Sequence, residues 1–386
     1  MPENIFLSAI NGYDETITEI SNREKNGTDF SEAKGEVTKC INKLHPKRLN
    51  LTVSKVISET PTCKTLRLKP EAGLLPPYQA GQYINIFVDI DGVSTARPFA
   101  ISSAPSQREY YDITIRYIAE GFVSRFLLEE VQVGQTFETT GPMGSFYHNP
   151  LFHGKDLVFL AGGSGVAPAM SMIQSIIDQG LPYNFHLIYG SRTVDDIIFQ
   201  DQLKTLESKH DFLKISEVIS EPDTAYAGTT GFITAELIGE LLGELTGKMF
   251  YICGPTAMNE FCKEELCKLG VQDKRIRMEV NGPPKNPENL EFWPEGVSPQ
   301  DMVTVTVQGK GSYQALIGEP LLNSLERNGY GAENACRSGE CSLCRCKLVS
   351  GKVFNPSEAK LRASDRTFGW LHSCVAFPVE DIEILL

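Results

Sequence analysis

The stretch CRSGECSLC occupies residues 336–344, and a further cysteine, Cys374, follows later in the chain. Three cysteines in one short loop and a fourth from a later segment form the C-x4-C-x2-C…C spacing at which four thiolates hold a 2Fe-2S cluster. Small Ser338 and Gly339 suit a tight loop whose backbone N–H groups point at cluster sulfurs. A zinc site would need paired short spacings or histidine partners, and the six histidines are not placed to help. The spacing therefore predicts an iron-sulfur centre with the ligands Cys336, Cys341, Cys344 and Cys374.

Outward from this loop, residues 303–386 form a compact unit that resembles plant-type ferredoxins, which implies a β-grasp-like fold. Cys346, close behind Cys344, leaves two interpretations open: a spare ligand, or a buried thiol on the strand that follows the loop. Four other cysteines are expected to be packing residues: Cys40, Cys63, Cys262 and Cys267.

Three further stretches precede this unit. Residues 49–152 contain short runs rich in β-branched and aromatic residues between Gly, Pro and Asp turns, which predicts an antiparallel β-barrel. Residues 153–282 alternate apolar strands with helical stretches, which predicts an α/β domain on a parallel sheet. Residues 283–302 are rich in proline and are interpreted as an ordered linker. The fold class expected is therefore multidomain.

The N-terminal extension, residues 1–48, is polar and carries no recognisable chemistry. Its role is unknown. Two hypotheses stay open: an arm for partner docking or dimerisation, and a helical appendage packed on the barrel.

Composition excludes some classes of function. The net charge of −13 argues against nucleic acid, whose phosphates need a clustered positive surface. No run approaches the ~20 apolar residues of a membrane-spanning helix, and the first residues lack the pattern of a signal peptide. We therefore expect no membrane span and a cytoplasmic protein. The sequence leaves the oligomeric state open.

The stretch RPFAISS, residues 97–103, ends a predicted strand and resembles the flavin motif of the ferredoxin-NADP reductase superfamily. The resemblance implies that Arg97 clamps the flavin pyrophosphate and that Phe99 packs against the isoalloxazine. Ala100 departs from the motif because it has no hydroxyl, so a backbone N–H or Ser102 would have to substitute. The cofactor-binding residues expected here are Arg97, Pro98, Phe99, Ala100 and Ser102.

A second stretch, residues 116–124, resembles the phosphate-binding turn of the same superfamily. It leads into an apolar helix, and a helix N-terminus with small residues presents free N–H donors to an anion. The turn GPMGSF at residues 141–146 resembles the one that closes the barrel in this superfamily. Their order and spacing imply a flavin, FAD in preference to FMN, held here by Arg116, Tyr117, Ile118, Gly121, Val123 and Ser124.

The stretch GGSGVAP, residues 162–168, lies between a predicted strand and a helix. Glycines let the backbone approach a pyrophosphate, and a proline in the first helical turn loses no hydrogen bond. This context, and the resemblance to the superfamily's Gly-x-Gly-x-x-Pro loop, predict that Gly163, Gly165 and Pro168 bind NAD(P).

The stretch CGPTAM, residues 253–258, resembles the superfamily's Cys-Gly-Pro loop. The resemblance implies a catalytic Cys253 near the nicotinamide carbon that gives up hydride, with cofactor contacts from Gly254, Pro255 and Met258. Glu279 occupies the place of the superfamily's carboxylate near the flavin and is the second expected catalytic residue. Val280 and Asn281 follow where many relatives have an aromatic residue, so the outer flavin face is either open to nicotinamide or shielded by the linker.

The choice between NADH and NADPH is expected at Ser191 and Arg192, which follow the second strand of the α/β unit. Arg192 suits a 2′-phosphate, whereas Asp195 and Asp196 would repel it. The pattern Y-G-S-R-T-x-x-D at residues 189–196 is similar to that of NADH-using oxygenase reductases, so NADH is favoured and NADPH stays possible.

Taken as a whole, residues 50–386 resemble phthalate and vanillate oxygenase reductases and the reductase of hybrid-cluster protein. The resemblance implies an NAD(P)H-dependent oxidoreductase that passes electrons from NADH to FAD, to the 2Fe-2S cluster and to a separate acceptor metalloprotein, such as an oxygenase or a hybrid-cluster protein. Two alternatives stay open: a non-catalytic conduit or redox-sensing subunit of a larger complex, and reverse flow from a reduced ferredoxin to NAD. The intact nucleotide loops favour the enzyme.

Overall fold

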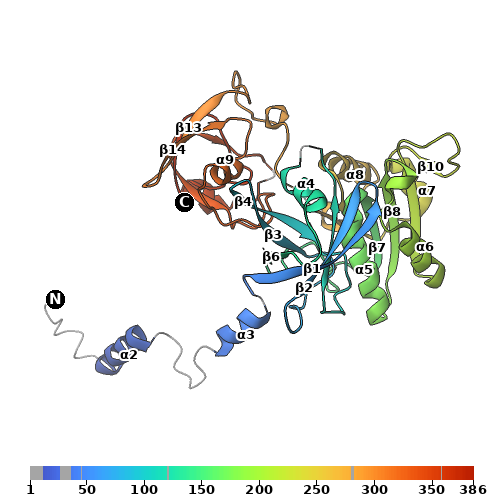
Figure 1. The fold of residues 1–386 in the computed structure, drawn as a ribbon, viewed down its shortest axis with the longest axis horizontal. Coiled ribbons are helices and arrows are strands. Elements are labelled where there is room, and N and C mark those ends of the chain that lie inside the picture. The colour runs from blue at the N-terminus through green and yellow to red at the C-terminus, as the bar shows by residue number, and fades with distance from the viewer. Residues whose placement is uncertain (1–11, 27–35, 45, 120, 280–281, 358) are drawn as a thin grey trace. The chain divides into compact units, whose positions relative to one another are not determined.

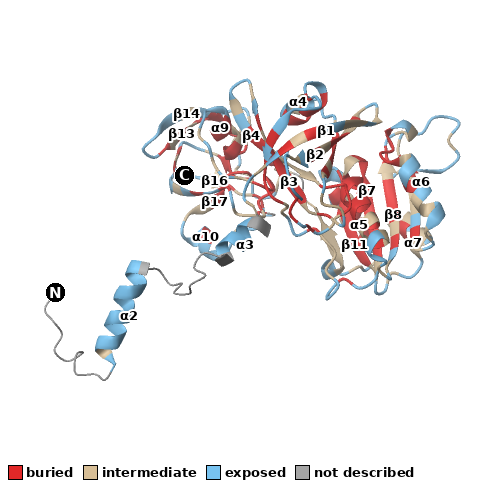
Figure 2. Cartoon of the chain, turned by 60° about the horizontal axis from the view of Figure 1, so that its bottom comes forward, coloured by how far each residue is buried: buried red, intermediate tan, exposed pale blue. Residues whose placement is uncertain are grey.

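The computed structural model describes residues 12–26, 36–44, 46–119, 121–279, 282–357 and 359–386. The chain separates into two compact units, residues 1–47 and 48–386. In the first, α2 (Tyr13–Asn26) and α3 (Glu36–Leu44) are described, and most of their described side chains are exposed (Figure 2). The rest of the N-terminal extension lies outside the described residues, so neither hypothesis about its role is tested.

The second unit begins with a six-stranded antiparallel sheet in the order β4-β3-β6-β1-β2-β5 (Figure 1). Its two outer strands meet where Ile101 pairs with Ile113, which closes the sheet into a barrel. Side chains of alternate residues fill the interior, among them Leu51, Ile84 and Ile113. The elements are β1 (Leu49–Thr60), β2 (Cys63–Pro70), β3 (Tyr83–Ile90), β4 (Val93–Ala100), β5 (Tyr111–Arg116), α4 (Phe122–Glu129) and β6 (Thr136–Thr139).

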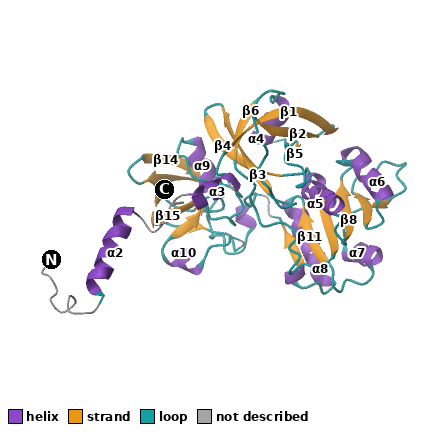
Figure 3. Ribbon diagram, turned by 90° about the horizontal axis from the view of Figure 1, so that it is seen from below, coloured by secondary structure: helices purple, strands orange, loops and turns teal. Residues whose placement is uncertain are grey.

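A parallel sheet follows in the order β10-β9-β8-β7-β11-β12. Its central strands β7, β8 and β11 are buried on both faces, by α5 and α6 on one and by α7 and α8 on the other (Figure 3). The strands are β7 (Asp156–Gly162), β8 (Asn184–Ser191), β9 (Leu213–Ile219), β10 (Thr229–Thr230), β11 (Met249–Cys253) and β12 (Ile276–Met278). The helices are η1 (Gly163–Gly165), α5 (Val166–Gln179), η2 (Val194–Asp196), α6 (Gln200–Lys209), α7 (Ala235–Leu242), α8 (Thr256–Lys268) and η3 (Asp273–Arg275).

The third sheet is mixed, in the order β14-β13-β19-β15-β17, and α9 packs on it. A two-stranded sheet of β16 and β18 lies in the same stretch of chain. The elements are β13 (Met302–Val307), β14 (Gly311–Leu316), α9 (Leu321–Arg327), β15 (Arg345–Ser350), β16 (Val353–Phe354), α10 (Ala363–Thr367), β17 (Trp370–His372), β18 (Phe377–Pro378) and β19 (Ile382–Leu385). The predicted fold class, a barrel, a parallel α/β domain and a β-grasp-like ferredoxin unit, is confirmed.

The linker contains one turn of 3-10 helix, η4 (Pro287–Asn289), in its described residues. Beyond that turn, Trp293 lies against the rings of Phe354 and Phe377 and donates its indole N–H to the carbonyl oxygen of Val297 at 3.0 Å. The neighbouring Phe292 is instead 79% exposed. Trp293 therefore packs the linker against β16 and β18, and Val297 adds a further apolar contact with the core of the third sheet.

We predict that Trp293→Ala lowers the free energy of unfolding of the ferredoxin unit, which contains the third sheet, by about 2–4 kcal/mol. The substitution removes aromatic packing and leaves a cavity. Phe292→Ala is the matched control and should change it by less than ~0.5 kcal/mol. Urea denaturation followed by the cluster's visible absorption measures both. Equal effects would mean that the packing of Trp293 adds no stability.

Candidate functional site

The four cysteines expected as cluster ligands come together. Cys336, Cys344 and Cys374 are buried and Cys341 is half-buried. Side-chain hydrogen bonds join the thiols in a row, Cys341 to Cys336, Cys336 to Cys374 and Cys374 to Cys344. Those from Cys341 and Cys374 lower the pKa of Cys336, and its sulfur also accepts the backbone N–H of Ser338 at 3.4 Å. The hydrogen bonds lower the pKa of the accepting thiols, Cys336 and Cys344, and raise the pKa of the donating thiols, Cys341 and Cys374.

The four thiols match in number and kind the ligand set of a 2Fe-2S cluster, in which four thiolates hold two irons. Cys346 is 1% exposed and packs in the core of the third sheet, which supports its interpretation as a buried thiol.

The two loops expected to hold the nicotinamide touch each other. A Cβ placed on Gly165 would lie 2.0 Å from the carbonyl oxygen of Cys253, and one on Gly162 would lie 2.2 Å from the sulfur of Met258. Only glycine allows this approach. Gly165 precedes α5, whose first turn contains the buried Pro168. The loops therefore form one surface at the carboxyl ends of β7 and β11, where open α/β sheets bind ligands.

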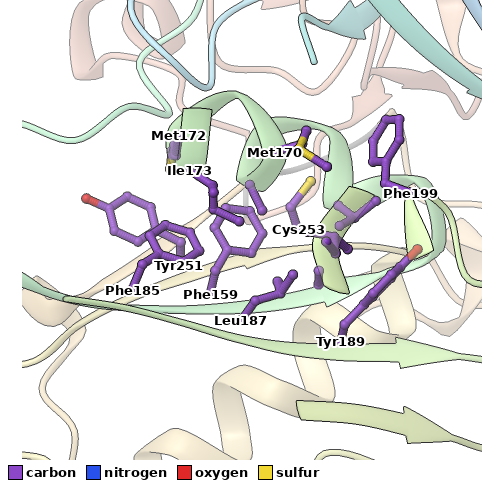
Figure 4. Close-up of a cluster of buried hydrophobic side chains, with 14 of the residues drawn as sticks. Phe159, Met170, Met172, Ile173, Phe185, Leu187, Tyr189, Phe199, Tyr251 and Cys253 are labelled. Atoms are coloured by element: carbon purple, nitrogen blue, oxygen red, sulfur yellow. The ribbon is translucent and has the colours of Figure 1, made fainter. Parts of the chain in front are cut away.

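Cys253 lies at the edge of the core between the parallel sheet and α5 (Figure 4) and is 5% exposed. Gly254 is buried beside it, and Pro255 precedes α8 as its N-cap. Behind the loop, the hydroxyl of Tyr189 donates to the carbonyl oxygen of Gly163 at 3.1 Å and accepts the backbone N–H of Ile198. Tyr189 thus holds the backbone of the glycine loop through the Gly163 carbonyl oxygen, a contact that the sequence did not predict.

Arg116 joins the barrel to the α/β unit. Its guanidinium donates to the Asp196 carboxylate at 2.9 Å and would be 2.5 Å from a Cβ on Gly163. Asp196 also accepts the hydroxyl hydrogen of Thr62 at 2.9 Å. The Asp196 carboxylate is therefore buried and paired with Arg116, so Asp196 is not the free charge that was expected to repel a 2′-phosphate.

The turn after Arg116 keeps its predicted form. Gly121 is the N-cap of α4, and no side chain caps the helix. The hydroxyl of Ser124 is buried without a hydrogen-bond partner, and Val123 packs in the barrel core. Tyr117 and Ile118 are exposed at its edge. A helix start with an open hydroxyl and free N–H groups fits a phosphate.

Arg97 lies at the end of β4 and donates to Thr95 Oγ1 at 2.7 Å and to the carbonyl oxygen of Ala96 at 2.8 Å. Burial, and then the positive charge of Arg337, lower the pKa of Arg97 to about 10. The single carboxylate that offsets these two cations here is Glu326. One net positive charge in a desolvated place fits a diphosphate.

The other residues of the flavin motif lie around Arg97. Phe99 packs against the barrel core, and Pro98 and Ala100 are half-buried. The Ser102 hydroxyl is buried, 3.2 Å from the carbonyl oxygen of Asp112 and 3.0 Å from the hydroxyl of Thr114. The Ser102 hydroxyl is therefore already hydrogen-bonded inside the barrel.

Glu279 follows β12 and is held by Asn259 of α8, whose side-chain N–H donates to the Glu279 carbonyl oxygen at 2.8 Å. Burial raises the pKa of the Glu279 carboxyl to about 8, and Glu340 and Cys336 add to the rise. Tyr83 of β3 interacts electrostatically with the same groups. Glu279, the barrel and the cluster loop are thus neighbours, although neither Asn259 nor Tyr83 belongs to a recognised motif. Val280 and Asn281 lie outside the described residues.

The residues expected to select the nucleotide, Ser191 and Arg192, lie at the carboxyl end of β8. Ser191 is buried and its hydroxyl has no hydrogen-bond partner. The exposed Arg192 lies 3.6 Å from the carboxylate of Glu221, which sequence reasoning missed because it follows a different strand. Glu221 therefore places an exposed carboxylate beside Arg192.

Comparison with known proteins matches three family models to this chain. They are an oxidoreductase FAD-binding domain over residues 48–148, an oxidoreductase NAD-binding domain over residues 159–264 and a 2Fe-2S iron-sulfur cluster binding domain over residues 305–379. These models support FAD, NADH and a 2Fe-2S cluster as the cofactors. No helix in the described residues is long and apolar enough to cross a membrane.

Relatives match over most of the chain. The glycine betaine monooxygenase reductase subunit of Chromohalobacter salexigens is 26% identical over 87% of this chain and 95% of its own length. The ferredoxin reductase component of the 3-ketosteroid-9-alpha-monooxygenase of Mycolicibacterium smegmatis is 28% identical over 86% of this chain and 95% of its own length. The solved structure of phthalate dioxygenase reductase has a TM-score of 0.65 at 19% identity, and covers 88% of this chain and 98% of its own.

We predict that Glu221→Gln raises kcat/KM for NADPH relative to NADH about five- to tenfold, because one negative charge beside the expected 2′-phosphate is removed. Asp195→Asn removes the other exposed carboxylate that is expected to repel a 2′-phosphate, and it is the competing variant. Steady-state reduction of an artificial dye with each nucleotide measures both variants. A larger gain in Asp195→Asn would assign the selectivity to that residue instead.

Glu279 gives a pH prediction. Its carboxyl titrates near 4.5 in the unfolded chain and near 8 in the folded one. Between these values the unfolded chain holds fewer protons, so stability falls as pH rises, by at most ~1.4 kcal/mol per pH unit. Glu279→Gln, which cannot ionise, should lack this fall, and thermal unfolding from pH 5 to pH 9 measures the difference. Parallel curves for the two proteins would contradict it.

Proposed function

Because this chain belongs to the ferredoxin-NADP reductase superfamily and carries a C-terminal 2Fe-2S domain, we propose that it is the reductase component that supplies electrons from NADH to an oxygenase. The chain is an NAD(H)-dependent oxidoreductase. Its cofactors are NADH, FAD and a 2Fe-2S cluster. We also propose domain boundaries at 49–152, 153–282 and 303–386.

The observation that carries the proposal is the contact between the cluster loop and the flavin motif. Arg337 directly follows the ligand Cys336, and its guanidinium donates to the carbonyl oxygen of Ala96 at 3.0 Å, next to Arg97. On the other side, Glu279 follows the sheet that carries Cys253 and interacts electrostatically with Cys336. The nucleotide loops, the flavin motif and the cluster loop therefore meet in one place.

When bound, the cofactors would supply the chemistry that takes two electrons from a hydride donor and passes them one at a time to a one-electron carrier. The chain's part is to position them. Gly163 and Gly165 open the backbone to the nucleotide diphosphate, and the buried Cys253 shapes the wall beside the nicotinamide and excludes water. Below pH 8 the Glu279 carboxyl is protonated and holds its proton beside the expected flavin site.

The acceptor is proposed from the relatives. The protein from Chromohalobacter salexigens serves, by its name, a glycine betaine monooxygenase, and the one from Mycolicibacterium smegmatis a 3-ketosteroid-9-alpha-monooxygenase. We infer an oxygenase as the acceptor class for this chain and leave its substrate open. Cytoplasmic residence is part of the same proposal.

We predict that stoichiometric NADH, added anaerobically to the purified protein, bleaches the flavin band and the broader iron-sulfur absorption. About two irons and one FAD should be found per chain, as the cluster and one flavin site require. An absorption titration with flavin and iron assays measures this. Both centres present with neither reduced by NADH would contradict the enzyme and favour the redox-sensing subunit.

A further inference from the structure

A buried network of charges joins the ferredoxin domain to the barrel. The guanidinium of Arg337 pairs with both carboxylate oxygens of Glu326, at 2.8 and 2.7 Å, and the two side chains are 4% and 6% exposed. The Glu326 carboxylate also accepts the hydroxyl hydrogen of Thr95 at 2.9 Å. Arg337 and Glu326 belong to the ferredoxin domain and Thr95 to β4, so the network crosses the boundary between the two domains.

Arg97 shares this network. The Thr95 hydroxyl oxygen and the Ala96 carbonyl oxygen each accept hydrogen bonds from Arg97, at 2.7 and 2.8 Å, and from Arg337, at 3.3 and 3.0 Å. Two guanidinium groups on the same two oxygens repel each other, and one carboxylate does not neutralise both. Docking of the ferredoxin domain is therefore electrostatically incomplete until an anion arrives at Arg97.

The backbone of Arg337 gives a second, independent observation. Its φ is +55°, a region that residues other than glycine seldom adopt. Such a conformation persists where the surroundings hold it, and the side chain of Arg337 is held on several sides. In addition to the barrel oxygens and Glu326, the guanidinium donates to the side-chain oxygen of Asn323 at 2.8 Å. The side chain of Arg337 thus secures the loop that carries Cys336.

We propose that Arg337 is a positioning residue that couples two events, the binding of the FAD diphosphate at Arg97 and the docking of the ferredoxin domain on the barrel. The diphosphate neutralises the pair of guanidinium groups, so FAD stabilises the docked arrangement. By linkage, the docked arrangement raises the affinity for FAD. A filled flavin site therefore raises the fraction of molecules in which the cluster loop is docked on the barrel. This inference rests on the proposed function in one respect, that Arg97 faces the FAD diphosphate.

The test compares Arg337→Gln with Arg345→Gln in the full chain. Both arginines directly follow a cluster ligand and both form an ion pair, but Arg345 pairs with Asp365 inside the ferredoxin domain. Apoprotein is titrated with FAD, and the loss of flavin fluorescence gives the affinity. Arg337→Gln should weaken FAD binding about tenfold, the usual size of such coupling. Arg345→Gln should change it by less than about twofold, as for a partly exposed pair.

Docking is measured separately by trypsin, which can cut after the exposed Lys285 of the linker. FAD should slow this cut about tenfold in the unchanged protein and much less in Arg337→Gln. Iron and sulfide assays and the spectrum of the reduced cluster confirm that the cluster is assembled. Should Arg337→Gln fail to assemble it, Thr95→Val removes the shared hydroxyl from the barrel side and is expected to shift both measurements in the same direction.

Unchanged FAD affinity in Arg337→Gln with its cluster intact, or in Thr95→Val, would overturn the coupling. Equal weakening in Arg345→Gln would overturn it as well, since the effect would then belong to the cluster loop in general. The proposed function fails in a different way, if the unchanged chain binds no FAD or is not reduced by NADH. The two failures are thus distinguishable.

Discussion

The buried contact between Arg337 and Glu326 is the constraint on which the rest of the arrangement depends. A buried ion pair gains little net stability, because desolvation offsets most of its attraction, but a misplaced partner leaves a buried charge unpaired. Such a pair therefore acts on geometry more than on stability. Here it allows one placement of the cluster loop against β4, the placement that leaves Arg97 beside it.

Close backbone approach has the same effect on the nucleotide side. The contact of Gly165 with the backbone of Cys253 leaves no room for a side chain, so the glycine loop and the Cys-Gly-Pro loop pack backbone against backbone. Asn259, one residue after Met258, holds the backbone of Glu279. One short helix start thus positions both the wall beside the nicotinamide and the carboxyl group beside the flavin site.

Local spacing was enough to predict the three-part fold, the four clustered thiols and the strand, loop and helix around Gly165, because each is written within a short stretch of chain. Contacts between distant stretches were not predictable. Glu221 reaches Arg192 from another strand, and Tyr83 reaches the cluster loop from the barrel. Asp196 was expected to repel a 2′-phosphate, but its carboxylate is paired with Arg116, which lies in a different domain and is distant in the sequence.

These long-range contacts are what turn three separable folds into one electron path. Hydrophobic packing already joins the barrel to the α/β unit, because Cys63 and Phe146 lie in the core of the parallel sheet, whereas the core of the third sheet contains residues of the ferredoxin unit and the linker. Polar contacts cross both boundaries, through Arg116 with Asp196 on one side and Arg337 with Thr95 on the other. Both arginines lie at sites where phosphate groups are expected. The charges that would bind the cofactors and the charges that hold the modules in place thus belong to the same small set of residues.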